Sequence, residues 1–134
     1  MASLTTIEGI GEAGAAKLAK AGVGSTATLL ARGATAAGRR DLSKASGVTE
    51  KRLLEWVNRA DLMRISGVGG QYSDLLEASG VDSVAELGKR KPANLAEAMA
   101  ALNAKKKLVR QLPTDARVAD WVAQAKKLPK VVKH

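Results

Sequence analysis

Apolar residues recur at helical spacing along the chain, in short segments that glycine or a capping residue separates. Within residues 12–21, for example, Ala15, Leu18 and Ala19 fall on one face of a helix. Within residues 50–61, apolar and charged side chains likewise divide between two faces. No segment is a strand candidate of any strength, and the pattern therefore predicts an all-α protein.

Residues that start and stop helices set the bounds of these segments. Ser25, Thr35 and Thr49 each precede an apolar segment, as N-caps do. Gly47 follows such a segment, as the residue beyond a helix end does. The expected helices are 12–21, 25–32, 35–46, 50–61, 70–79, a short one from 83, 94–102, 104–112 with Asn103 as its cap, and one from 114 or 115 to about 128. The last residues, 130–134, are expected to be loose.

A glycine-rich stretch occurs twice in the chain. Residues 7–29 and 65–87 share nine identities in 23 positions when they are aligned at an offset of 58. Glycines at fixed places within such a match indicate an internal duplication. The identical pairs are Ile7/Ile65, Gly9/Gly67, Gly11/Gly69, Leu18/Leu76, Gly22/Gly80, Val23/Val81, Ser25/Ser83, Ala27/Ala85 and Leu29/Leu87.

The two copies extend beyond the glycine-rich stretch. Glu55-Trp56-Val57 and Asp120-Trp121-Val122 match in kind and order at an offset of 65 residues. Both tryptophans are expected to be packing residues, in the core or between the halves. We expect two halves, residues 1–63 and 64–134, packed together as one compact unit because no flexible linker separates them.

Composition narrows the class of protein. The chain of 134 residues is 46% hydrophobic, but its aromatic residues are only Trp56, Trp121 and Tyr72, so Ala, Leu, Val and Ile must build the core. It contains no cysteine, which excludes disulfides and thiolate chemistry. No apolar run reaches the length of a membrane span, about 18 residues. We therefore expect a soluble, cytoplasmic protein without a membrane partner.

Charge is distributed unevenly along the chain. The net charge of +9 suggests a nucleic acid partner, although many soluble domains are simply basic. Residues 65–87 carry four acidic and no basic side chains, whereas residues 88–134 carry twelve basic and three acidic ones. Nearly all of the positive excess therefore lies in the last third of the chain.

The glycine-rich stretch has the chemistry of an anion site. In Gly9-Ile10-Gly11 the glycines permit backbone angles that other residues avoid, and they keep side chains out of the turn. Backbone N–H groups of the turn and of the next helix then point outward, with the positive end of the helix dipole behind them. A phosphate is the natural ligand of such a site. Ile10 and Val68 are expected to point inward and hold each turn.

The pattern apolar-x-Gly-apolar-Gly between two helices resembles the helix-hairpin-helix motif. Residues 4–130 resemble a bacterial family of tandem helix-hairpin-helix domains of unknown function, related in fold to sterile-alpha-motif-like domains. The duplication predicts two pseudo-repeated five-helix halves, and the resemblance implies that each half is a helix-hairpin-helix pair. Each pair has one regular and one degenerate hairpin, the latter at 45–49 and 101–105. In such proteins the hairpins grip the DNA backbone without reading bases.

The candidate contacts to DNA phosphates are the two hairpins and the basic residues around them. They are Gly9, Ile10, Gly11, Lys17, Lys20, Gly67, Val68, Gly69, Lys89, Arg90, Lys91, Lys105, Lys106, Lys107 and Arg110. Asp74 and Glu77 follow the second hairpin and would repel a phosphate chain. We therefore favour the first hairpin and the lysine-rich second half as the DNA surface, with Gly67-Val68-Gly69 acting as architecture. The simpler alternatives are tight turns and a solvated helix face.

Two functions fit this sequence. One is a non-sequence-specific DNA-binding module, located at the nucleoid, whose binding weakens with salt. The other is a protein-interaction or self-assembling module, in which oppositely charged halves pack head to tail into homo-oligomeric rings or filaments. An enzyme is not expected, and neither is a metal or another cofactor, because the chain has no cysteine and its single histidine is His134.

Overall fold

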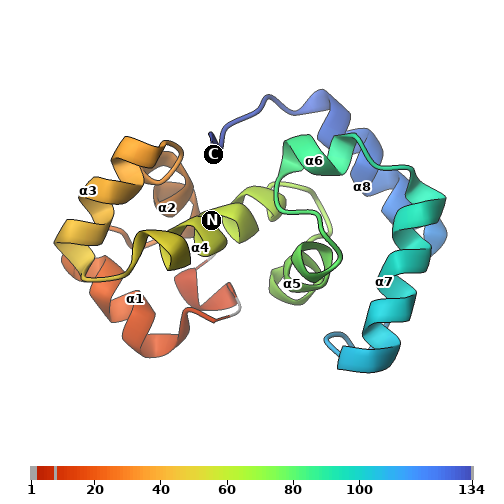
Figure 1. The fold of residues 1–134 in the computed structure, drawn as a ribbon, viewed down its shortest axis with the longest axis horizontal. Coiled ribbons are helices and arrows are strands. Elements are labelled where there is room, and N and C mark those ends of the chain that lie inside the picture. Colours follow the sequence, from red (N-terminus) through yellow and green to blue (C-terminus); the bar gives the residue numbers. More distant parts are fainter. Residues whose placement is uncertain (1–2, 8, 134) are drawn as a thin grey trace. The chain divides into compact units, whose positions relative to one another are not determined.

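The computed structural model describes residues 3–7 and 9–133, and all regular elements in these ranges are helical (Figure 1). The all-α prediction is therefore confirmed. The elements are the 3-10 helix η1 (Leu4–Thr6) and the α-helices α1 (Gly11–Lys20), α2 (Thr26–Arg32), α3 (Ala36–Ser46), α4 (Glu50–Leu62), α5 (Gly70–Ala78), α6 (Val84–Gly88), α7 (Pro92–Lys106) and α8 (Asp115–Lys127). The chain divides into two compact units. Unit 1 holds the described residues up to Asp61 and from Val131 onward, and unit 2 holds Leu62–Lys130.

Side-chain caps begin five of these helices, at positions that the sequence predicted. In each, a serine or threonine hydroxyl oxygen accepts a hydrogen bond from the backbone N–H three residues on, at 3.1 to 3.2 Å. Such a cap stabilises a helix by about 1 kcal/mol. The capping residues are Ser25, Thr35, Thr49, Ser83 and Thr114, at the starts of α2, α3, α4, α6 and α8.

The segment from 94 to 112 differs from the prediction, which divided it into helices 94–102 and 104–112. A single helix, α7, begins at Pro92 and runs to Lys106. The fixed φ of proline suits the first turn of a helix, where no N–H group is needed, so the helix starts earlier than expected. The two-helix prediction is wrong, and unit 2 contains the four helices α5 to α8 where five were expected.

Asn103 explains the difference. The sequence suggested that it caps a new helix, but it lies inside the last turn of α7. Its side-chain amide donates to the carbonyl of Val109 at 3.1 Å and accepts from the N–H of Val109 at 3.0 Å. These two bonds hold residues 107–114 as an irregular loop. Lys107 ends α7 in a left-handed conformation, with φ 50°.

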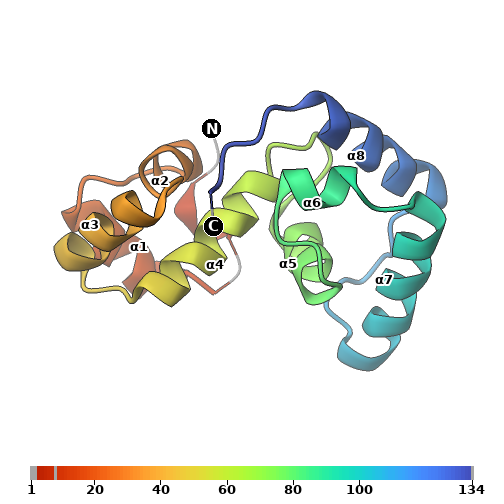
Figure 2. The same ribbon diagram turned by 45° about the horizontal axis from the view of Figure 1, so that its top comes forward.

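The C-terminal segment also contradicts a prediction, because residues 130–134 were expected to be loose. Val132 is 1% exposed. The backbone N–H of Lys133 donates to the carbonyl of Ala34 at 2.7 Å, and its carbonyl accepts from Arg39 Nη2 at 2.9 Å. Figure 2 shows this segment, in dark blue, running back to unit 1. An apolar side chain and two backbone hydrogen bonds therefore hold the segment, while the final residue lies outside the described ranges.

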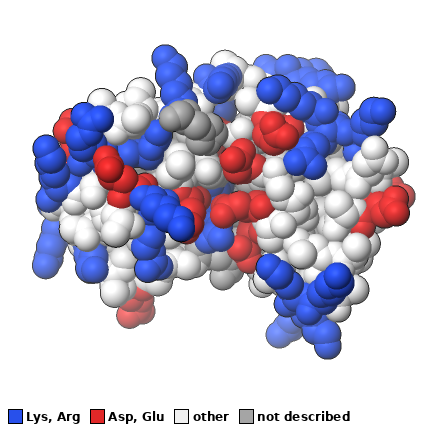
Figure 3. Space-filling model, viewed as in Figure 1, with Lys and Arg blue, Asp and Glu red and all other residues white. Residues whose placement is uncertain are grey.

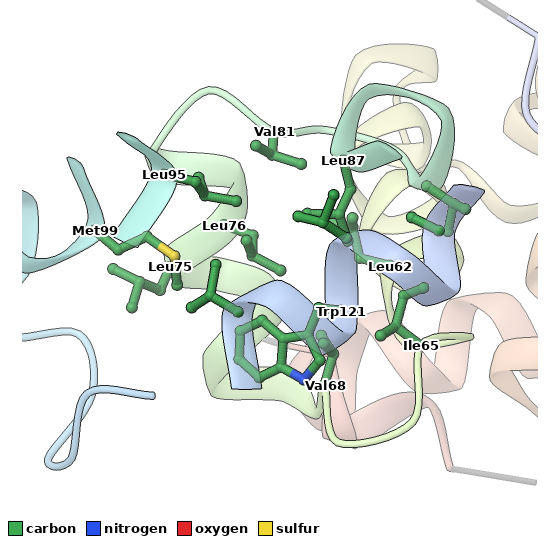
Figure 4. Packing of buried hydrophobic residues seen from close by; sticks show 14 of the residues in the cluster. Leu62, Ile65, Val68, Leu75, Leu76, Val81, Leu87, Leu95, Met99 and Trp121 are labelled. Carbon is green, nitrogen blue, oxygen red and sulfur yellow. The ribbon is translucent and has the colours of Figure 1, made fainter. Parts of the chain in front are cut away.

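Each unit has its own core of aliphatic side chains around one tryptophan. In unit 1, Leu18, Leu29 and Leu42 are fully buried and Trp56 is 3% exposed. In unit 2, Trp121 is 1% exposed and lies among leucine, isoleucine, valine and methionine side chains from all four helices (Figure 4). The expectation that both tryptophans are packing residues is confirmed.

Gly38 provides a test of the packing in unit 1. It lies in the first turn of α3, where alanine is normally preferred over glycine by about 1 kcal/mol. A Cβ at this position would lie 2.2 Å from the backbone carbonyl oxygen of Arg32. We expect Gly38→Ala to lower the free energy of unfolding by about 1–3 kcal/mol, because only a shift of the backbone can relieve this clash. Urea denaturation followed by circular dichroism measures the change.

Gly24→Ala is the matched control in the same unit. Gly24 does not have a positive φ, and a Cβ there would meet no heavy atom within 4 Å. We expect its stability to stay within about 0.5 kcal/mol of the parent protein or to rise slightly. Equal losses in the two variants would contradict the steric explanation.

Candidate nucleic-acid interface

The first glycine-rich turn joins η1 to α1 in unit 1. Gly9, with φ 91°, and Gly11, with φ 61°, both have left-handed backbone angles that favour glycine. Ile10 is 4% exposed, which confirms that it points inward. Its N–H donates to the carbonyl of Ile7 at 3.4 Å and so closes the turn instead of facing solvent. Helix α1 then begins without a side-chain cap.

A second turn of unit 1, between α3 and α4, lies beside the first one (Figures 1 and 2). Both turns contribute to the wall of one cavity of about 300 Å3. Its lining includes Ile10, Gly14 and Lys17 on the side of α1, and Val48, Arg52 and Trp56 on the side of α4. The cavity therefore lies near the starts of two helices, where the helix dipole is positive.

Two basic side chains flank this cavity, Lys17 from α1 and Arg52 from α4. The guanidinium of Arg52 lies 5.5 Å from the centre of the Trp56 ring, and its Nη2 lies 3.5 Å from the carbonyl oxygen of Gly9. Lys20 is exposed in the last turn of α1 but does not line the cavity. Of the two predicted lysines on α1, only Lys17 therefore lines the cavity.

The second glycine-rich turn precedes α5 in unit 2. Gly67 has a left-handed φ of 95°, whereas Gly69 is extended, with φ −101°. Val68 is 4% exposed, and its N–H donates to the carbonyl of Ile65 at 3.0 Å. A cavity of about 410 Å3 opens at this turn. Its lining includes Gly67, Gly69, Gly70, Tyr72, Arg110 and Gln111, so the loop after α7 brings Arg110 to the turn.

Aromatic side chains hold this part of unit 2 together. The rings of Tyr72 and Trp121 are 5.3 Å apart and inclined at 53°. The guanidinium of Arg117 lies 5.5 Å from the first ring and 5.9 Å from the second. The hydroxyl of Tyr72 donates to the carbonyl of Gln111 at 3.0 Å, which fixes the loop that carries Arg110.

The basic run Lys89, Arg90 and Lys91 lies away from this turn. Arg90 Nη2 donates to the carbonyl of Gly80 at 2.8 Å, and its Nε lies 3.3 Å from Glu86. Gly80 follows the C-terminal end of α5, whereas the glycine-rich turn precedes its N-terminal end. A helix of nine residues spans about 13 Å, so Arg90 caps the far end of α5.

The lysines at 105, 106 and 107 are exposed at the C-terminal end of α7. Figure 3 shows basic side chains gathered over this end of the helix, at the lower right of the view. Positive charge is favourable there because the C-terminal end of a helix dipole is negative. Arg110, expected on the same helix as these lysines, instead leaves the helix and lines the cavity of unit 2.

Arg52 and Arg117 contact the tryptophans and approach the glycine-rich turns, yet the sequence did not single them out. The sequence nevertheless contains a pattern that could have identified both arginines. Each arginine lies three residues after a capping threonine, Thr49 or Thr114, and four residues before a tryptophan. Residues at i and i+4 share a helix face, so this spacing puts the guanidinium over the indole ring.

The described residues thus form an all-helical protein in which basic side chains lie near two glycine-rich turns. The chain belongs to the family described as a domain of unknown function, DUF4332, which matches residues 8–128. Comparisons with curated proteins and with solved structures found no match. Among the described residues, no helix combines the length and the apolar character that a bilayer crossing requires.

Gly67 is expected to be necessary for the stability of unit 2. Its φ is 95°, and a Cβ there would lie 3.1 Å from the indole Nε1 of Trp121. We expect Gly67→Ala to lower the free energy of unfolding by about 1–3 kcal/mol, because both the backbone angle and the ring contact oppose a side chain. Urea denaturation, followed by tryptophan fluorescence, measures this loss.

Gly69→Ala is the control within the same turn. Gly69 is extended, and a Cβ there would meet no heavy atom within 4 Å. We expect its cost to stay below about 1 kcal/mol, the scale of replacing an N-terminal helix cap. If Gly69→Ala were as damaging as Gly67→Ala, the contact with Trp121 would not explain the need for glycine.

Proposed function

We propose that this protein is a non-sequence-specific DNA-binding module that holds the phosphate backbone at the cavity of unit 1. The observation that carries the proposal is the meeting of two turns, two helix starts and two basic side chains at one cavity. Phosphate oxygens suit such a place, because they accept hydrogen bonds from backbone N–H groups and from lysine and arginine. The proposed location is the cytoplasm, at the nucleoid.

Backbone contacts of this kind position DNA without reading its sequence. In unit 1 the available donors are Lys17, Arg52 and the first-turn N–H groups of α1, which has no side-chain cap. The net charge of +9 adds long-range attraction for a polyanion. Binding should therefore depend on salt far more than on base sequence.

A second phosphate contact is proposed in unit 2, where Arg110 and the turn at Gly67 share a cavity. The exposed lysines at the end of α7 would raise the positive potential near it. Asp74 and Glu77, which were expected to repel phosphate, each have an interaction partner within the protein.

We also propose that the two units are copies of one helix-hairpin-helix pair. In unit 1 the N–H of Val23 donates to the carbonyl of Leu18 at 2.9 Å, and 58 residues later Val81 and Leu76 make the same bond at the same distance. The degenerate hairpin of the second pair was expected at 101–105, but these residues lie within α7, so that expectation is wrong and the loop 107–114 takes its place in this proposal. Further residues with matching contacts are Gly9 and Gly67, Ser25 and Ser83, Arg32 and Arg90, Arg52 and Arg117, and Trp56 and Trp121.

The cavity of unit 1 is tested by Lys17→Ala in a DNA titration. Fluorescence anisotropy with a labelled duplex measures Kd, and wild-type binding should weaken steeply between about 50 and 200 mM salt. We expect Lys17→Ala to raise Kd severalfold at low salt. The slope of log Kd against log salt should fall by about one, because one phosphate contact is lost.

Lys20→Ala is the matched control, since it removes the same charge from the same helix outside the cavity. It should leave the salt slope unchanged. Equal effects of the two variants would show that net charge alone attracts DNA, and the cavity would lose its proposed role. If the wild-type protein does not bind DNA even at low salt, the proposed function is wrong.

Unit 2 is tested in the same titration by Arg110→Ala, with Lys91→Ala as its control. Both residues are basic and lie in unit 2, but only Arg110 lines the cavity at the turn. We expect Arg110→Ala to reduce the salt slope by about one and Lys91→Ala to leave it unchanged. If Lys91→Ala reduced the slope and Arg110→Ala did not, the DNA contact would instead lie near the C-terminal end of α5.

A further inference from the structure

Unit 1 is not a continuous stretch of chain. Its helices end near Asp61, and Val131–Lys133, here called the tail, returns to it only after the whole of unit 2. Val132 is 1% exposed, so the tail supplies part of the buried interior of unit 1. Unit 1 therefore has a site for an extended peptide, here called the tail site, and in this chain its own C-terminal segment occupies that site.

The tail site holds the backbone of the tail at two points. The N–H of Lys133 donates to the carbonyl of Ala34 at 2.7 Å, and its carbonyl accepts from Arg39 Nη2 at 2.9 Å. Arg39 is 5% exposed, and its Nη1 donates to the carbonyl of Gly33 at 2.7 Å. Burial lowers the pKa of Arg39 and the Glu50 carboxylate opposes this shift, but an arginine keeps its charge in proteins. The hydrogen bonds from Lys133 to Ala34 and from Arg39 to Lys133 use backbone atoms of the tail, so the tail of another copy can form the same two bonds.

The connection between the tail and unit 2 has almost no slack. Within unit 2, Arg64 Nη2 donates to the carbonyl of Pro129 at 3.0 Å. The tail is anchored at Val132 and Lys133, so only Lys130 and Val131 lie between the two anchored points. The proline ring stiffens the connection further. Short hinges of this kind favour exchange between molecules, because the tail of another copy is not tied to unit 2 of the molecule that receives it.

We propose that the tail site of one molecule binds the tail of a second copy of this chain. Two molecules that exchange tails mutually form a closed dimer, whereas molecules that each pass their tail onward form an open chain. The contacts are the same as within one molecule, so exchange needs no new surface. The molecule's own tail competes at an effective concentration of about a millimolar, so exchange grows with protein concentration. The proposal does not rest on DNA binding.

The first test varies the length of the connection between unit 2 and the tail. Size-exclusion chromatography with light scattering measures the molar mass of each variant in solution. Deletion of Lys130 leaves Val131 alone between the anchored points and should produce dimers or longer chains even in dilute solution. An insert of about six glycine and serine residues after Lys130 should keep the protein monomeric at about 0.1 mM, well below the effective concentration of its own tail. The wild type should lie between the two, with a mass that rises with concentration. Neither hinge variant changes the tail or its site, so both should fold.

A mixing experiment separates tail exchange from other association. In the Lys130-deleted chain, Arg39→Ala weakens the tail site and Val132→Asp weakens the tail. Each variant alone should be monomeric, because the first lacks an intact tail site and the second lacks an intact tail. The mixture should form one-to-one complexes, detected by energy transfer between two labels, because one intact site can meet one intact tail.

Two results would overturn the proposal. One is a Lys130-deleted chain that stays monomeric at every concentration. The other is association that persists in the Val132→Asp variant of that chain. Circular dichroism of each variant confirms that the helices are retained before its mass is compared.

Discussion

A buried tryptophan packs against the turn glycine in both units, and this contact positions most of what surrounds it. A Cβ at Gly9 would lie 3.8 Å from Trp56 Nε1, and one at Gly67 would lie 3.1 Å from Trp121 Nε1. At Gly67 the indole therefore leaves little room for a side chain, whereas at Gly9 a Cβ would be in ordinary contact with the indole, and the φ of 91° is what favours glycine there. The arginine one turn before each tryptophan reaches the same glycine-rich turn as the indole.

Positive charge serves two physical purposes in this protein. Several arginines donate to backbone carbonyls, as Arg39, Arg64 and Arg90 do, because a guanidinium offers five donors in a fixed plane. Lysines such as Lys17 and Lys105 are exposed and carry their charge into solvent. The net charge of +9 thus combines arginines that join parts of the fold with lysines that create the outward field.

The tail makes the integrity of unit 1 depend on a segment that follows unit 2 in sequence. The family match ends at residue 128, so the tail lies outside the matched residues. Docking of Val132 therefore follows from contacts in this structure and not from family membership. Because the tail follows unit 2 in the sequence, the stability of unit 1 depends on the chain that joins them. The tail site of unit 1 can also accept the tail of a second copy.

Local signals in the sequence determined most helices, because a cap such as Thr35 or a proline at a first turn acts within a few residues. The inward positions of Ile10 and both tryptophans also followed from local pattern. The destinations of Arg90, Arg110 and Asn103 did not, because a long or polar side chain binds whichever backbone group the packing brings within reach. Tertiary structure alone decided that one basic residue caps a helix, another lines a cavity, and an asparagine holds a loop.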